Sequence, residues 1–249
     1  RREKLNKDFY NQKEKRFDLS KVPDLNDMIR YDILHNSNAE LEGMRELYEG
    51  IRAFENTLVP QEYGANKAEK KLIGSKVCGA LLEKIKYDLK VSRSDTTHDM
   101  RYMLDHSHAE DLEINSLGRV VRTRLYFTSE SHMHTLLNVL RHVKVKKENG
   151  KEIRAISSEG LKIIEDVPEL SYLTQIVIRL FEDREDHTKF RCEISFSPGS
   201  TTDIFTDKSP TVAPYKTING NISCDDLIAC LTQAVVIGKE LPPEEADKT

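Results

Sequence analysis

A short polar segment of the chain places two imidazoles, one carboxylate and three hydroxyls within seven residues. It spans residues 128–134 and reads TSESHMH. An imidazole can donate hydrogen bonds to phosphate oxygens and transfer a proton near neutral pH. These residue types therefore indicate a site for phosphate or for a transferring phosphoryl group. The alternative interpretation is a polar helix cap, because serine and threonine are common at helix N-termini.

The segments on either side of TSESHMH predict a strand followed by a helix. Residues Val120–Thr128 (VVRTRLYFT) are β-branched and aromatic, and Ser131–Val143 carries apolar residues at helical spacing. In α/β folds anions bind where a strand ends and a helix begins, because free N–H groups and the helix dipole favour negative charge there. The sequence thus places the polar segment at such a junction.

Residues 1–90 read as a helical subdomain. Apolar spacing predicts helices over about Pro23–Ile33, Ala39–Leu58 and Asn66–Leu89, the last with Glu69 completing a capping box. Pro60 and Gly64 are expected to form the turn before the third helix. Residues 91–118 lose this periodicity and are rich in polar residues, which is typical of a mobile loop.

Residues 119–240 are expected to form the α/β portion, and residues 241–249 a tail. Leu173–Phe181 and Lys189–Ser197 read as strands of an antiparallel hairpin, and Asp225–Ile237 as a final helix capped by Ser223. A short helix is expected around residues 157–166. The predicted class is therefore α/β, with a mixed sheet, flanking helices and a helical subdomain.

Composition excludes several classes of partner. The 249 residues carry 38 Lys+Arg against 42 Asp+Glu, a net charge of -4, which does not favour binding to nucleic acid or to an anionic membrane. No apolar stretch reaches the ~18 residues of a membrane span, and the charged start does not resemble a secretory signal. We expect a cytoplasmic chain. The four cysteines lack metal-ligand spacing, so neither a metal nor another cofactor is expected.

Five segments resemble a known family. RTRLYFTSESHMHTLLNVLR (Arg122–Arg141) resembles a signature of the histidine acid phosphatase-like domain in the bifunctional diphosphoinositol pentakisphosphate kinases. Asp18–Ser37, Glu46–Lys70, Glu169–Asp183 and Phe190–Gly199 also resemble this family, in the same order. The resemblance implies a histidine-phosphatase fold, inositol pyrophosphates and other inositol polyphosphates as ligands, and an ATP-grasp kinase domain in the same parent polypeptide.

The resemblance also implies a mechanism with two histidines. An Arg-His motif supplies the nucleophile, and a later histidine, matched here by His132, stabilises the transferring phosphoryl group. The family frame usually has a carboxylate after this histidine, whereas this chain reads His132-Met133-His134. A pyrophosphate leaves as phosphate, whose second pKa is about 6, so it needs less protonation than an alkoxide. Glu130, His134 or a substrate phosphate remain alternative proton donors.

The predicted site has two groups of residues. His132 and Glu130 are the candidate catalytic residues. The candidate substrate contacts are Ser129, Ser131, His134, Arg122 and Arg124.

The nucleophile motif is the part of the mechanism that this sequence lacks. The family form is Arg-His-x-x-Arg-x-Pro, and no such string occurs. We expect the N-terminal half of the phosphatase domain to lie on polypeptide outside this sequence, since the chain begins without Met inside a charged, helix-like segment. This chain alone is then inactive. The alternative is a catalytically inactive module that binds inositol polyphosphates or a partner.

A basic stretch follows the polar segment, from Arg141 to Arg154. It could steer a polyanionic substrate toward the site. The alternative is a solvated loop.

Overall fold

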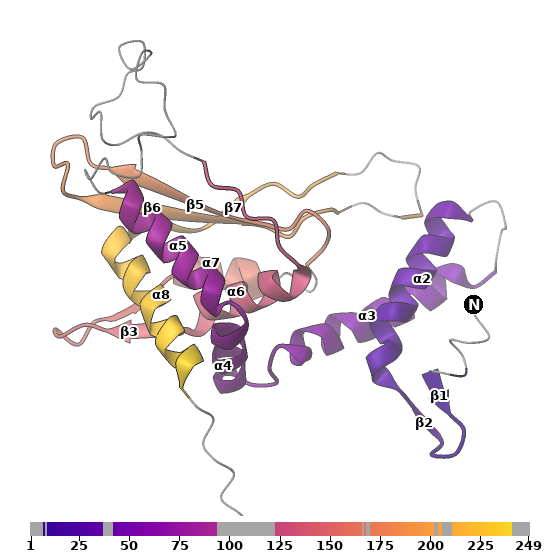
Figure 1. Cartoon of the computed structure of the whole chain (residues 1–249). Coiled ribbons are helices and arrows are strands. Elements are labelled where there is room, and N and C mark those ends of the chain that lie inside the picture. Colours follow the sequence, from indigo (N-terminus) through magenta and orange to yellow (C-terminus); the bar gives the residue numbers. More distant parts are fainter. Residues whose placement is uncertain are drawn as a thin grey trace, which may run out of the picture.

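The structure is a computed structural model in which a core of helices and one three-stranded sheet is joined to a pair of helices (Figure 1). It describes residues 7, 9–36, 42–93, 123–165, 167, 170–201, 204–205 and 211–240. The helices are η1 (Leu19–Lys21), α2 (Val22–His35), α3 (Met44–Glu62), α4 (Lys67–Val77), α5 (Gly79–Ser92), α6 (Glu130–His142), α7 (Ser158–Glu165) and α8 (Cys224–Lys239). The strands are β1 (Tyr10–Asn11), β2 (Arg16–Phe17), β3 (Lys144–Lys146), β4 (Glu152–Arg154), β5 (Gln175–Glu182), β6 (Phe190–Ser197) and β7 (Lys216–Ser223).

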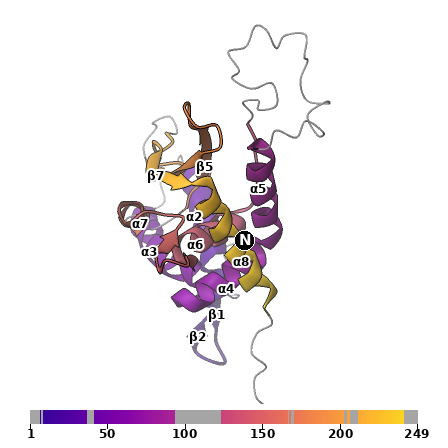
Figure 2. The ribbon, with the colours of Figure 1, turned by 90° about the vertical axis from the view of Figure 1, so that its left-hand side faces the viewer.

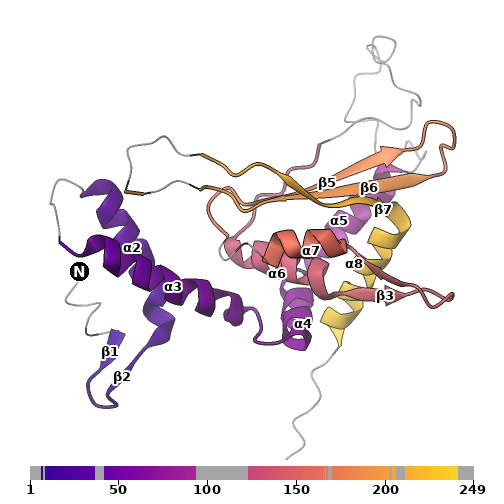
Figure 3. The same cartoon turned by 180° about the vertical axis from the view of Figure 1, so that it is seen from behind.

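The largest sheet has the order β5-β6-β7, with antiparallel neighbours. The predicted hairpin is confirmed: β5 pairs with β6 from Gln175 opposite Ser197 to Glu182 opposite Phe190. The central strand β6 contributes fully buried apolar residues such as Ile194 to the core. The helices α5, α6, α7 and α8 lie on one side of this sheet (Figure 3). The short pairs β1-β2 and β3-β4 are antiparallel too.

Helices α4, α5, α6 and α8 pack against one another and complete the core. α8 contacts both α4 and α5, and Figure 2 shows α8 running beside α5. Ser223 caps α8 as predicted, since its Oγ accepts from the Asp226 N–H at 3.1 Å. α4 approaches α6 closely because position 74 is glycine: a Cβ at Gly74 would lie 2.8 Å from the Thr135 carbonyl oxygen. This contact fixes the position of α6, which carries the polar segment.

The helices α2 and α3 pack against each other and extend to one side of the core (Figures 1 and 3). Asn26 of α2 is buried, and its side-chain amide donates to the carboxylate of Glu55 on α3. In α2, the side chain of Asn36 donates to Asp32 at 2.8 Å. Because the pair meets the core near the start of α6, it can form one wall of a site there.

Two helix boundaries differ from the prediction. The region expected as one helix over Asn66–Leu89 forms two, α4 and α5, which divide at Cys78. Gly79 follows directly and is a poor helix former, so the helix has little resistance to breaking there. Pro60, expected in a turn, lies inside α3, which continues to Glu62. Proline has no N–H to donate to the Asn56 carbonyl and crowds that turn, and α3 ends two residues later.

The predicted strand over Val120–Thr128 is wrong for its described part. Residues 123–129 are extended but pair with no strand of the described chain, and they are exposed to solvent. Residues rich in β-propensity still need a neighbouring strand to form a ladder. Residues 120–122 of that range lie outside the described residues. Of the loop predicted over 91–118, residues 91 and 92 instead belong to α5, and residues 94–118 lie outside the described residues. No helix in the described part is long and apolar enough to cross a membrane.

Candidate active site at the start of helix α6

A hollow with a volume of about 350 Å³ lies where α2, α3, the start of α6 and the segment before β5 meet. The helical pair and α6 supply the polar groups, and residues 170–174 close one side. The lining residues are Asn26, Asp27, Arg30, Glu55, Asn56, Val59, Pro60, Thr128, Glu130, Met133, His134, Leu170, Ser171, Tyr172, Leu173 and Thr174. The hollow therefore joins segments that are distant in the sequence.

Helix geometry divides the predicted site residues between two faces of α6. Glu130, Met133 and His134 line the hollow, and their spacing of three and four places them on one face. His132 does not line it. Successive residues of a helix turn by about 100°, so the side chains of His132 and His134 point about 200° apart. The structure therefore brings Thr128, Glu130 and His134 together, and directs His132 elsewhere.

His134 is held between the hollow and an aromatic ring. Its imidazole stacks on Tyr63, with ring centroids 4.9 Å apart and an angle of 14° between the planes. Its Nε2 lies 3.3 Å from Glu130 Oε1 and is shielded from solvent, and among the described residues it has no hydrogen-bond partner. The His134 side chain is only 12% exposed. His134 therefore reaches the hollow beside Glu130, with its ring supported by Tyr63.

His132 faces the neighbouring side of the core. Its Nδ1 lies within hydrogen-bonding distance of the Ser129 hydroxyl, 3.1 Å away. Its carbonyl accepts from the buried Cys78 thiol at the end of α4, at 3.4 Å. Burial raises the pKa of that thiol, so Cys78 remains a neutral donor. Ser129 is the N-cap residue of α6, and its side chain contacts His132 instead of capping the helix.

The remaining predicted contacts lie away from the hollow. Ser131 is half-buried, and its carbonyl accepts from the Thr135 hydroxyl at 2.6 Å. Arg124 lies 3.9 Å from the Asp88 carboxylate of α5, which also accepts from the Tyr126 hydroxyl. Burial and the adjacent Asp88 raise the pKa of Tyr126 to about 12, so it stays protonated. Arg122 lies outside the described residues.

The helical pair supplies residues that sequence reasoning missed. Asn26, Arg30 and Asn56 line the hollow from α2 and α3. The guanidinium carbon of Arg30 lies over the Tyr172 ring, 5.7 Å from the ring centroid. Their spacing carries no metal-ligand or catalytic pattern. The available signal was the family resemblance of Asp18–Ser37 and Glu46–Lys70, since these two segments contain all three residues.

The charges around the hollow are mainly negative. Asp27, Glu55 and Glu130 supply carboxylates, and Arg30 supplies a permanent cation. Within the described lining, this balance does not attract a polyanion by itself. A phosphorylated ligand would have to use Arg30, the His134 imidazole and the N–H groups at the start of α6.

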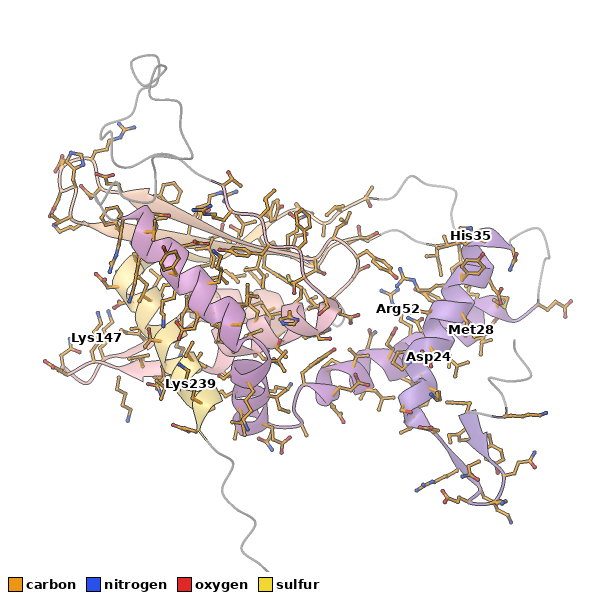
Figure 4. All side chains as sticks on the ribbon, viewed as in Figure 1. Asp24, Met28, His35, Arg52, Lys147 and Lys239 are labelled. Carbon is orange, nitrogen blue, oxygen red and sulfur yellow. The ribbon has the colours of Figure 1, made fainter. Side chains whose placement is uncertain are left out.

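The basic stretch from Arg141 to Arg154 does not offset the negative charge around the hollow. Lys144 and Arg154 both pair with Glu152, and Lys147 pairs with Asp226. Figure 4 shows Lys147 on the opposite side of the molecule from the labelled residues of α2 and α3. The stretch is thus a hairpin, β3-β4, neutralised in part by its neighbours. The structure favours the interpretation as a solvated hairpin over steering toward this hollow.

Comparison with known proteins identifies the family. A profile described as "Histidine phosphatase superfamily (branch 2)" matches residues 1–197. The chain therefore belongs to the histidine phosphatase superfamily and has its fold, which confirms the predicted α/β class.

The curated relatives are more specific. The chain is 41% identical over 201 residues to the human inositol hexakisphosphate and diphosphoinositol-pentakisphosphate kinase 2, covering 79% of this chain and 15% of that protein. It is 32% identical to the Arabidopsis thaliana kinase VIP1 of the same description, covering 79% of this chain and 24% of that protein. The Saccharomyces cerevisiae relative is 29% identical over 161 residues.

The chain thus spans less than a quarter of the length of these relatives. No solved structure matches it. The resemblance identified from TSESHMH and its flanks is confirmed: this is a histidine-phosphatase-like domain similar to part of the bifunctional inositol phosphate kinases.

Proposed function

We propose that this chain is part of a phosphatase domain that removes the β-phosphate from diphosphoinositol polyphosphates. The nucleophilic histidine of the reaction lies outside this chain, on the polypeptide that carries the Arg-His motif. Membership of the histidine phosphatase superfamily supports the phosphohydrolase class, and the names of the relatives support inositol phosphates as the ligand. The observation that carries the proposal is the placement of Glu130 and His134 at the start of α6, facing a hollow.

The residues of α6 would do the work of positioning and proton transfer. A phosphoryl group bound at the start of α6 meets N–H groups that point out of the helix. His134, with Glu130 beside it, can hold a proton and release it to the leaving phosphate. Arg30 neutralises one phosphate from the opposite wall. His132, which matches the later histidine of the family motif, would act from the other face of α6. Experiment must therefore distinguish which of the two imidazoles takes part in the reaction.

The decisive experiment measures phosphate release from diphosphoinositol pentakisphosphate by the full-length protein that carries this chain. We expect His132→Ala or His134→Ala to lower kcat by at least about 100-fold, the usual range for a lost acid, base or phosphoryl contact. His187→Ala, on the exposed turn between β5 and β6, is the matched control and should leave the rate unchanged.

The outcomes separate three interpretations. If only His132→Ala inactivates the protein, the family motif identifies the catalytic residue and the hollow serves binding. If only His134→Ala does, the hollow is the reaction site. If the wild-type protein binds the substrate in calorimetry without releasing phosphate, the phosphatase proposal is overturned and the chain belongs to an inactive binding module.

A further inference from the structure

We propose that Tyr63 is a positioning residue that holds the His134 imidazole against the hollow. The catalytic part of this inference rests on the function proposed above. Tyr63 does not line the hollow, whereas His134 does. The two rings are nearly parallel, 4.9 Å apart. The imidazole is therefore confined between the tyrosine ring on one side and the hollow on the other.

The position of Tyr63 is set by the turn that joins α3 to α4. Gly64 follows it with φ of 118°, a conformation that residues with a Cβ rarely adopt. A Cβ at Gly64 would lie 2.5 Å from the Lys70 backbone nitrogen, so the turn also requires the small size of glycine. The Gly64 N–H donates to the Gln61 carbonyl at 3.0 Å. This turn leaves the backbone before Gly64, and with it Tyr63, little freedom.

The capping box of α4 holds the other side of the same turn. Asn66 Oδ1 accepts from the Ala68 and Glu69 N–H groups, and Glu69 Oε2 accepts from the Ala65 N–H at 2.8 Å. α4 in turn packs closely on α6 at Gly74. The backbone at Tyr63 is thus held to α4 by the turn, and α4 packs directly on α6, which carries His134. That is the arrangement expected of a residue that supports a functional side chain.

The ring of Tyr63, and not its hydroxyl, makes this contact. In the described part of the chain no hydrogen bond of the tyrosine oxygen is seen, while the two rings lie nearly parallel with their centroids 4.9 Å apart. Offset or parallel aromatic contacts contribute beyond the area they bury. Phenylalanine at position 63 should therefore keep the stack on His134, and a non-planar side chain should lose it. Stacking also explains how Nε2 of His134 remains oriented although it has no hydrogen bond.

The first test uses this chain without any substrate. Diethyl pyrocarbonate modifies exposed imidazoles, and peptide mass spectrometry gives the rate for each histidine. We expect Tyr63→Ala to raise the rate at His134 about two- to tenfold, the population change that loss of one aromatic contact allows. Tyr63→Phe should keep the wild-type rate. Tyr87→Ala, at an exposed tyrosine on α5, is the control and should change the labelling rate of neither His134 nor His132.

A further variant and the labelling rate of His132 distinguish loss of the stack from a folding defect. Tyr63→Leu keeps an apolar side chain, although a shorter one, and cannot stack. It should therefore label His134 as fast as Tyr63→Ala, with unchanged far-ultraviolet circular dichroism. General unfolding would raise labelling at His132 as well. Wild-type labelling of His134 in both Tyr63→Ala and Tyr63→Leu would overturn the inference.

The second test measures kinetics in the full-length protein. If Tyr63 positions His134 for chemistry, Tyr63→Ala should lower kcat at least about tenfold with KM changed less than about twofold, and Tyr63→Phe should restore kcat. A loss in KM alone would overturn the positioning role. If the wild-type protein releases no phosphate, the proposed function fails, but the labelling result still decides whether Tyr63 holds the imidazole.

Discussion

The His142 side chain lies where the end of α6 comes near the first turns of α4. Burial is the main cause that lowers its pKa to about 4, and the positive charges of Arg141, Lys70, Lys67 and Lys71 lower it further. An unfolded histidine titrates near 6.5. Between these two values the unfolded chain binds more protons than the folded chain, so the folded state loses stability as the pH falls.

This pKa shift predicts a pH-dependent stability with a defined window. Between about pH 6.5 and pH 4 the wild-type chain should lose stability attributable to His142, on the order of 1 kcal/mol after allowance for its partial exposure. His142→Gln should remove that part of the slope in urea unfolding at pH 7 and pH 5. Lys70→Gln should reduce it. An unchanged slope in His142→Gln would contradict the assignment.

The packing of α4 on α6 depends on a single small residue. A Cβ at Gly74 would meet the Thr135 carbonyl oxygen at 2.8 Å and the Val139 side chain at 3.1 Å. Gly74→Ala should therefore destabilise the chain by about 1–3 kcal/mol, because the helices must separate, despite the better helix propensity of alanine. Gly50→Ala, in α3 with open space around it, is the control and should stabilise by up to about 1 kcal/mol. Thermal unfolding would measure both. A stabilised Gly74→Ala would show that α4 and α6 are not in close contact.

Elements whose signal is local were predictable from the sequence. Helix α6 and helix α8 have apolar residues at helical spacing and a serine at the N-cap position, and the hairpin β5-β6 combines two β-branched runs with a charged turn. Strand β7 was missed for a physical reason. Its buried residues Ile218 and Ile222 are four apart, which suits one face of a strand, but the residue between them on that face is Gly220. The run Asn219-Gly220-Asn221 is typical of a turn, so the apolar alternation that identifies a strand is missing.

The site was predictable as a segment but not as an arrangement. The residue types in TSESHMH indicated a phosphate site, yet the sequence could not show which face of the helix meets the hollow. That face, which carries Glu130 and His134 and not His132, is set by how α6 packs against its neighbours. The contributions of Asn26 and Arg30 depend on how the α2–α3 pair docks, which is a tertiary property. The segment 123–129 is a second case of a tertiary property. Its residues favour a strand, but no strand of the described chain pairs with it.

The whole molecule is arranged so that the hollow is the meeting point of the α2–α3 pair and the core (Figures 1 and 3). Its walls come from α2, α3, α6 and residues 170–174. A ligand that touches all of them would hold the pair and the core together. Binding then stabilises the closed arrangement over locally opened states, in proportion to ligand concentration and affinity.

This arrangement predicts the pattern of protection by a ligand. With inositol hexakisphosphate as the probe, amide hydrogen exchange should slow together in α2, α3, the first turn of α6 and residues 170–174, although these segments are far apart in the sequence. Arg30→Ala removes a charge-assisted contact. It should therefore raise about tenfold the ligand concentration that gives the same slowing of exchange. Arg45→Ala, on α3 but outside the hollow, is the matched control. Protection confined to β3, β4 and the turn between them would place the polyanion on the basic hairpin instead, and the carboxylates around the hollow would then explain why.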